Sequence, residues 1–91
     1  MEARRVVRTE KQIMWPGGLH PHVAILVLED GRRIDAADAI WQIDVRALAF
    51  RLTVGNVAAD VTVERCPVCS VDQLGTPLDT ATRHPLLALA D

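Results

Sequence analysis

Aromatic residues are nearly missing from this chain of 91 residues, which has two tryptophans, one phenylalanine and no tyrosine. Hydrophobic residues still make up 49% of it, so a core must be built from Val, Ile, Leu and Ala. The length suits a single domain over residues 1–91 and is too short for a second catalytic domain. The shortage of aromatic rings also disfavours single-stranded nucleic acid as a partner, because bases stack on such rings.

Long hydrophobic runs are also missing. The longest apolar stretch, Val23–Leu28, is far below the ~18–20 residues of a membrane-spanning helix. The charged N-terminal region has no apolar segment of the signal-peptide kind. The only two cysteines lie three positions apart, which disfavours a secreted disulfide scaffold. These features predict a cytoplasmic protein with reduced thiols and no contact with a membrane.

Neither positive nor negative charge dominates the composition of the chain. Nine arginines and one lysine stand against twelve acidic residues, and the formal net charge of −2 gives no general attraction to nucleic acid or anionic lipid. Four of the cations lie near the N-terminus: Arg4, Arg5, Arg8 and Lys11. We interpret them as the solvated side of an edge strand, with nucleic-acid contact as the disfavoured alternative.

A β-hairpin is the clearest structural pattern. Residues 48–64 alternate apolar and polar side chains around Gly55-Asn56, which is typical of a two-residue turn. Pairing about this turn places four apolar pairs on one face: Val54 with Val57, Leu52 with Ala59, Phe50 with Val61 and Leu48 with Val63. The other face receives Arg51 opposite Asp60, an attraction of ~0.2–1 kcal/mol.

Before the hairpin, the sequence predicts two strands and one helix. Residues 5–13 form the first strand, residues 15–18 a loop, and the continuous apolar run 23–28 a strand buried on both faces. A helix is predicted from Asp35, whose side chain can cap it, to about Asp44. Its inner face would carry Ala36, Ile40 and Ile43, widened by Trp41.

After the hairpin, residues 66–69 turn the chain, residues 71–74 form a short fifth strand, and the apolar tail 85–90 packs over the sheet or meets a partner. The predicted fold is α+β: one mostly antiparallel sheet of four to five strands against one short helix, in the order ββαββ with a variable C-terminal end.

One stretch suggests a family. Gly17-Gly18-Leu19-His20-Pro21-His22, followed by the apolar strand and Asp30-Gly31, resembles a family of small bacterial and phage proteins catalogued as a domain of unknown function, number 3892 in that series. The likeness extends to Thr76, Asp79 and the leucines of residues 86–89. It implies the fold and draws attention to the two histidines, but it implies no activity. Pro21, where the family usually has an acidic residue, and the cysteines depart from the family pattern.

The cysteines suggest a metal site. In Cys66-Pro67-Val68-Cys69, two thiolates on one tight turn can share a tetrahedral zinc ion. His20 and His22, two apart at the start of a strand, would project to the same side and could supply the other two ligands, with His84 as a spare. Such a site would be structural if closed and hydrolytic if one position stayed open. Alternatively, the cysteines are simply small buried hydrophobes.

Other chemistries have weaker signals. A redox pair is expected at a helix N-terminus, whereas this pair follows a strand. A histidine acting as general base could be oriented by Asp30, Asp35 or Asp79, and the spacing selects none of them. The only serine, Ser70, lies in no nucleophile motif.

Two functions therefore remain as hypotheses. The first is a small intracellular binding or adaptor domain, expected to have no enzymatic activity, that contacts a protein partner or forms a homodimer. The second is a zinc-binding protein that uses His20 and His22 with Cys66 and Cys69, in a structural or hydrolytic site.

Overall fold

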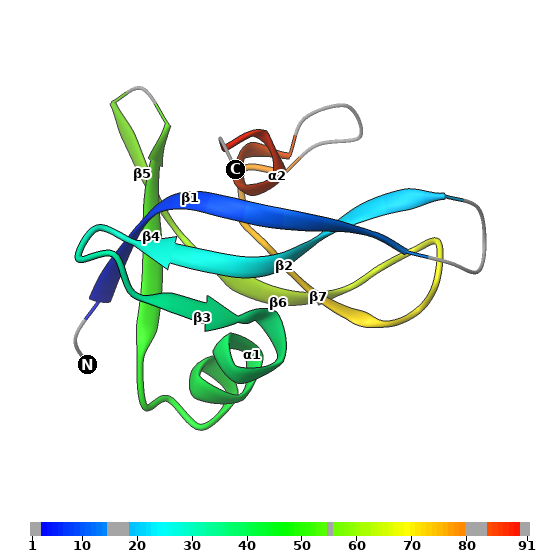
Figure 1. Cartoon of the computed structure of the whole chain (residues 1–91), viewed down its shortest axis with the longest axis horizontal. Coiled ribbons are helices and arrows are strands. Elements are labelled where there is room, and N and C mark those ends of the chain that lie inside the picture. The colour runs from blue at the N-terminus through cyan, green and yellow to red at the C-terminus, as the bar shows by residue number, and fades with distance from the viewer. Residues whose placement is uncertain (1–2, 15–18, 55, 80–83, 90–91) are drawn as a thin grey trace.

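The computed structural model describes residues 3–14, 19–54, 56–79 and 84–89 and shows an α+β architecture (Figure 1). The predicted loop at 15–18 and the turn residue Gly55 lie outside these described residues. The elements are, in order, strands β1 (Ala3–Met14), β2 (His20–Leu28) and β3 (Arg33–Asp35), helix α1 (Ala36–Asp44), strands β4 (Ala49–Val54), β5 (Val57–Asp60), β6 (Thr62–Arg65) and β7 (Asp72–Gly75), and the short helix α2 (Pro85–Ala88).

The strands form two sheets. The larger has the order β3-β2-β1-β4-β5 and the smaller consists of β6 and β7. All neighbours are antiparallel except β1 and β4, which run parallel where residues 3–5 meet residues 49–51. The predicted α+β fold, with a sheet of four to five strands against a short helix, is confirmed. The order of strands, the parallel pair and the second sheet could not be inferred from the sequence.

The predicted hairpin is confirmed near its turn and wrong farther away. Leu52 lies opposite Ala59 and Arg51 opposite Asp60, whose side chains form an ion pair with an Nε–Oδ1 distance of 3.1 Å. The amide of Val61 still donates to the carbonyl oxygen of Phe50 over 2.8 Å. Regular pairing then stops, so the expected Leu48–Val63 pair does not form. Val63 instead lies opposite Leu74 on β7, because the second strand of the hairpin leaves the large sheet and continues in the small one.

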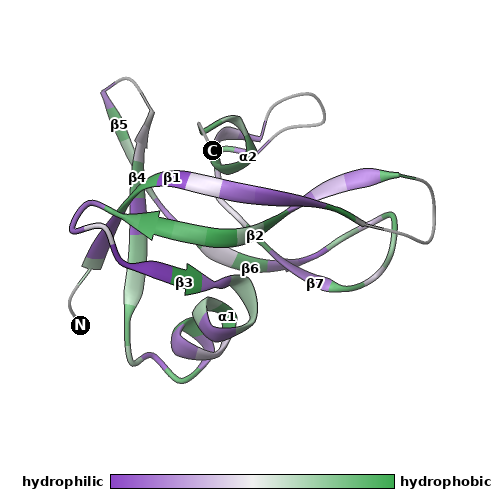
Figure 2. Cartoon of the chain, in the orientation of Figure 1, coloured by the Kyte–Doolittle hydropathy of each residue, from purple (hydrophilic) through white to green (hydrophobic). Residues whose placement is uncertain are grey.

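The hydrophobic core lies between the two sheets. Its wholly buried aliphatic and aromatic side chains include Leu26 and Leu28 on β2, Phe50 and Leu52 on β4, and Leu86 on α2. Colouring by hydropathy shows β2 as hydrophobic after a hydrophilic start, whereas much of β1 is hydrophilic (Figure 2). The apolar run 23–28 is thus an inner strand, as predicted, and β1 carries the charged outer surface.

Helix α1 begins and ends close to the predicted residues, but two details differ. Asp35 occupies the N-cap position without a side-chain hydrogen bond to the helix. Ala36, Ile40 and Ile43 pack against the core as expected. Trp41 does not widen this face, since it is 58% exposed. The side chain of Trp41 points about 100° farther round the helix axis than that of Ile40. The fully buried Ala39, rather than Trp41, packs beside the core.

The apolar C-terminal segment packs on the large sheet, one of its two predicted outcomes. Leu86 is 1% exposed, and its carbonyl oxygen accepts a hydrogen bond of 2.9 Å from the hydroxyl of Thr9 on β1. The ammonium of Lys11 donates to the carbonyl oxygen of Leu89. Among the described residues, no helix is long and apolar enough to cross a membrane.

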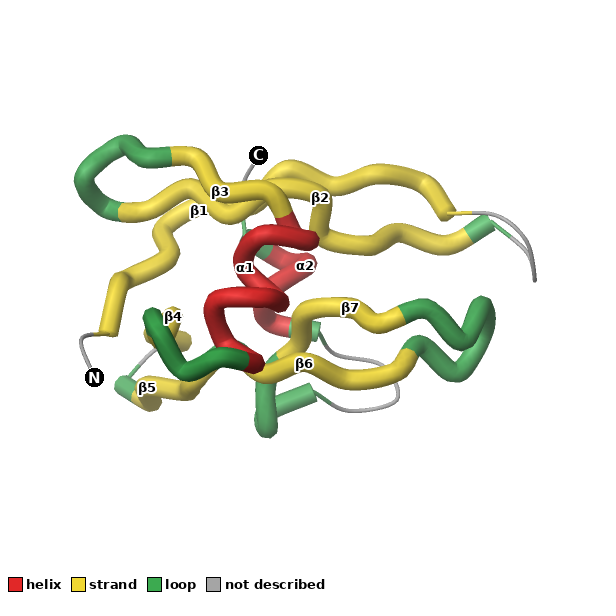
Figure 3. Tube along the Cα trace, turned by 90° about the horizontal axis from the view of Figure 1, so that it is seen from below, coloured by secondary structure: helices red, strands yellow, loops and turns green. Residues whose placement is uncertain are grey.

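Seen from below, strands β1–β3 form one layer and the β6–β7 hairpin forms another (Figure 3). The two helices lie at opposite edges of the space between these layers, α1 near β3 and α2 near β1 (Figure 1). Helix α1 contacts both layers, and so does α2. The start of β2 and the turn between β6 and β7 lie at the same end of the molecule (Figure 3). This arrangement brings the two histidines to the two cysteines.

Candidate metal centre

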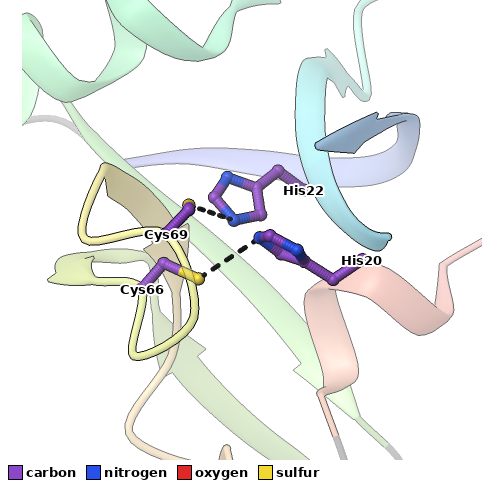
Figure 4. Close-up of side chains that lie close together, drawn as sticks. All are labelled: His20, His22, Cys66 and Cys69. Atoms are coloured by element: carbon purple, nitrogen blue, oxygen red, sulfur yellow. Dashed lines mark hydrogen bonds between the residues drawn. The ribbon is translucent and has the colours of Figure 1, made fainter. Parts of the chain in front are cut away.

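Two segments far apart in sequence meet at this end of the molecule. His20 and His22 are alternate residues at the start of β2, so their side chains project to one side of the strand. Cys66 and Cys69 lie on the turn that joins β6 to β7. All four side chains point toward one another (Figure 4), and the structure thus brings together the four predicted ligands.

The distances are those of a potential coordination sphere. The Sγ of Cys66 lies 3.6 Å from the Nε2 of His20, and the Sγ of Cys69 lies 3.7 Å from the Nε2 of His22. All four ligand atoms lie within 4.8 Å of one another. The two imidazole rings meet edge to face, with centroids 4.9 Å apart and an interplanar angle of 65°.

These distances fit a tetrahedral ion. With Zn–S near 2.3 Å and Zn–N near 2.0–2.1 Å, tetrahedral angles give an S–N separation of about 3.5 Å between ligands. The two observed S–N distances differ from this value by no more than about 0.2 Å. The group of two histidines and two cysteines can therefore hold a metal such as zinc.

The turn between β6 and β7 holds the cysteines in place through its backbone. The amide of Ser70 donates to the carbonyl oxygen of Cys66 over 2.9 Å, and the amide of Cys66 donates to the carbonyl oxygen of Val71 over 3.0 Å. Ser70 has a φ of 61°, a left-handed conformation that reverses the chain. Pro67 directly follows the first cysteine, and its ring fixes its own φ. A compact Cys-x-x-Cys loop results.

The same turn favours the thiolate form of Cys66. Burial would raise the pKa of this thiol, but the backbone amides of Cys69 and Val68 donate to the sulfur, and the side chains of His22 and Cys69 assist them. Together these hydrogen bonds lower the pKa from 9.0 to about 6. The thiolate is the form that binds metals, so the turn prepares one ligand before any ion arrives.

Burial divides the four residues into an inner and an outer pair. His22 and Cys66 are 4% and 3% exposed, whereas His20 and Cys69 are half-buried. An ion at this site would therefore lie close to the surface at the end of the molecule. The aspartates considered as partners for a catalytic histidine do not join the group: Asp30 is exposed beyond the far end of β2, and Asp35 is exposed at the start of α1.

A second polar group lies beside the candidate metal centre, and the sequence did not reveal it as a group. Asp79 receives a 3.1 Å hydrogen bond on Oδ1 from the hydroxyl of Thr76, and its Oδ2 lies 3.7 Å from the Nδ1 of His84. Glu64 of β6 also hydrogen-bonds Asp79. Burial, this hydrogen bond and the charge of Asp79 raise the pKa of Glu64, against a lowering effect of His84. The only sequence feature that involved Glu64 was the apolar–polar alternation of residues 62–65, which predicts a strand.

Comparison with known proteins adds no relative, since no family model, no curated protein and no solved structure matches the chain. The resemblance to the family of unknown function therefore stays a prediction, and the function must be argued from the site alone.

Proposed function

We propose that the chain is a small zinc-binding domain in which His20, His22, Cys66 and Cys69 hold one ion. The observation that carries this proposal is the pair of S–N distances of 3.6 and 3.7 Å, which match the spacing of ligands around tetrahedral zinc. Soft thiolates together with imidazoles favour zinc over the hard cations magnesium and calcium, which prefer oxygen ligands.

The role that suits this centre is structural. Four protein ligands complete a tetrahedron and leave no open position for a catalytic water molecule. The ion would join the start of β2 to the turn between β6 and β7, two segments that share no strand pairing. It would thus act as a cross-link between the two sheets, and this disfavours the hydrolytic alternative.

A zinc-stabilised domain of this size acts on other molecules by binding them, and we propose a protein partner or a second copy of the chain. The feature that supports this is an exposed apolar pair at the end of α1: Trp41 is 58% and Val45 50% exposed, one helical turn apart. Sedimentation velocity of wild type and Trp41→Glu tests self-association through this face. An oligomer in wild type that is lost in the variant supports it, and monomers in both samples exclude the homodimer.

The zinc centre is tested first by elemental analysis of protein purified without a histidine tag. We expect about one zinc per chain, and a lower melting temperature after a chelator removes it. Cys69→Ser and His22→Ala should both lose the ion and the response to chelator. His84→Ala is the matched control, since this histidine lies outside the cluster, and it should keep both.

Two results would change the proposal. Loss of zinc in His22→Ala but not in Cys69→Ser would show a histidine-centred site that does not use the cysteines. If no metal co-purifies and chelator leaves the melting temperature of wild type unchanged, the four residues do not form a zinc centre.

A further inference from the structure

A pocket with a volume of about 180 Å³ lies between the β6–β7 hairpin and the C-terminal segment. Its walls are largely apolar and include Leu74, Leu86 and Leu87. Its polar lining includes Glu64, Asp79 and His84. Nothing in the proposed zinc centre uses these three groups, and apolar walls with a few convergent polar groups are typical of a ligand site.

Gly75 makes the polar end of this pocket possible. A Cβ atom at residue 75 would lie 1.8 Å from the Oε1 of Glu64 and 2.7 Å from the Oδ2 of Asp79. Both carboxyl groups therefore converge over the bare backbone of β7, where any side chain would displace them. Thr76, which is 2% exposed, fixes one of them through its hydrogen bond to Asp79.

We propose that this pocket binds a primary alkylammonium group, with the charged head between Glu64 and Asp79 and the alkyl stem against Leu74, Leu86 and Leu87. Two carboxylates this close repel each other, and in the empty pocket the hydrogen bond between Glu64 and Asp79 relieves this repulsion by sharing one proton, which an ammonium would replace. An ammonium supplies the positive charge and three hydrogen-bond donors to carboxyl oxygens. The apolar walls favour a cation that carries a hydrocarbon stem over a bare ion.

The geometry separates this proposal from a second metal site. In the part of the chain that the structure describes, only the histidine–cysteine cluster brings three or more potential ligand atoms within reach of one ion. An anionic ligand is disfavoured because it would face two carboxyl groups. The proposal is independent of the zinc centre, although His20 and Cys66 also line the pocket, so zinc content must be measured in every sample.

The test is an NMR titration of the protein, with its native metal content, against n-butylammonium, with n-butanol as a neutral probe of the same butyl stem and butyrate as an anionic probe of similar length. We expect saturable shifts of the Leu74, Gly75 and Leu87 amides with butylammonium, at a dissociation constant of the order of millimolar for so small a ligand. Butyrate and butanol should bind at least tenfold more weakly. Equal binding of butyrate, or binding that calcium displaces at lower concentration than butylammonium needs, would overturn the proposal.

Variants locate the binding. Glu64→Gln and Asp79→Asn keep the shape of each side chain but remove its charge, and each should weaken butylammonium binding at least tenfold while zinc content stays unchanged. Gly75→Ala should weaken binding of the probe by displacing the carboxyl groups of Glu64 and Asp79. Asp72→Asn, an exposed carboxylate on the same strand, is the control and should bind as wild type does. Unaltered binding in Glu64→Gln, or equal losses in all four variants, would show that the probe binds surface acids rather than this pocket.

Discussion

Phe50 is the largest of the wholly buried side chains and lies on β4 beside Val61. Replacing it with alanine removes a ring from an interior that has no other buried Phe, Trp or Tyr side chain among the described residues. We expect Phe50→Ala to lower the free energy of unfolding by about 3–5 kcal/mol, from lost burial and the cavity left behind. Urea denaturation measures the change. Arg51→Ala, next to it on the exposed face, should cost only about 0–1 kcal/mol, and equal costs would contradict the placement of the two faces.

Ala39 and Trp41 show that residue size is a poor guide to burial on α1. Ala39 is fully buried and Trp41 is mostly exposed, so Ala39→Leu should destabilise by about 1–3 kcal/mol through overpacking. Trp41→Gln should change stability by no more than about 0.5 kcal/mol. Thermal melts of both variants provide the comparison. A larger loss in Trp41→Gln than in Ala39→Leu would mean that the helix faces the core with its other side.

At the scale of elements, α2 depends on a contact with β1. The hydroxyl of Thr9 is buried and donates to the carbonyl oxygen of Leu86. Thr9→Val has nearly the same shape but leaves that carbonyl unpaired, and it should cost about 1–3 kcal/mol. Truncation after His84 should cost more, because it also removes the burial of Leu86. Chemical denaturation of both variants tests this order. An unchanged melt after truncation would mean that the segment adds nothing to the fold.

Elements were predictable from the sequence where local periodicity decides them. Alternation around residues 48–61 fixed the hairpin register, and the spacing of Ala36, Ile40 and Ile43 fixed the inner face of α1. The sequence prediction put Trp41 on the inner face of α1, and this was wrong. Hydrophobicity alone does not show whether a residue next to the apolar face of a helix lies toward the core or toward solvent. Periodicity also could not show that the second strand of the hairpin changes sheet at Val61, since the apolar–polar alternation of the sequence continues without a break from residue 59 to residue 64.

The candidate centre was predictable only as a possibility. Spacing showed that His20 with His22, and Cys66 with Cys69, can each act as a pair. Whether the pairs meet depends on two hairpin tips lying at the same end of the molecule, which tertiary packing decides. The group of Glu64, Asp79 and His84 was harder still, because its three members lie on separate segments. Two of them, Glu64 and Asp79, meet over a glycine.

For the whole molecule, removal of the proposed zinc should loosen one layer before the other. Among the described strands, the β6–β7 hairpin has no pairing to the large sheet, and a two-stranded hairpin alone is marginal in water. We expect chelator to speed hydrogen exchange of amides in residues 62–75 while β1 and β2 stay protected. Mass spectrometry of wild type, with Cys69→Ser as a control that should not respond to chelator, makes the comparison. A uniform increase over all strands would instead mean that the ion supports the entire fold.

The position of the four ligands along the chain also bears on the order in which the protein folds. His20 and Cys66 are 46 residues apart, and His22 and Cys69 are 47 apart. Closing a loop of this length costs the unfolded chain about 3 kcal/mol in conformational entropy. The two cysteines need no such closure, so they can capture an ion first, and the histidines complete its coordination when β2 docks. If β2 docks after the rate-limiting barrier, zinc slows unfolding much more than it speeds refolding.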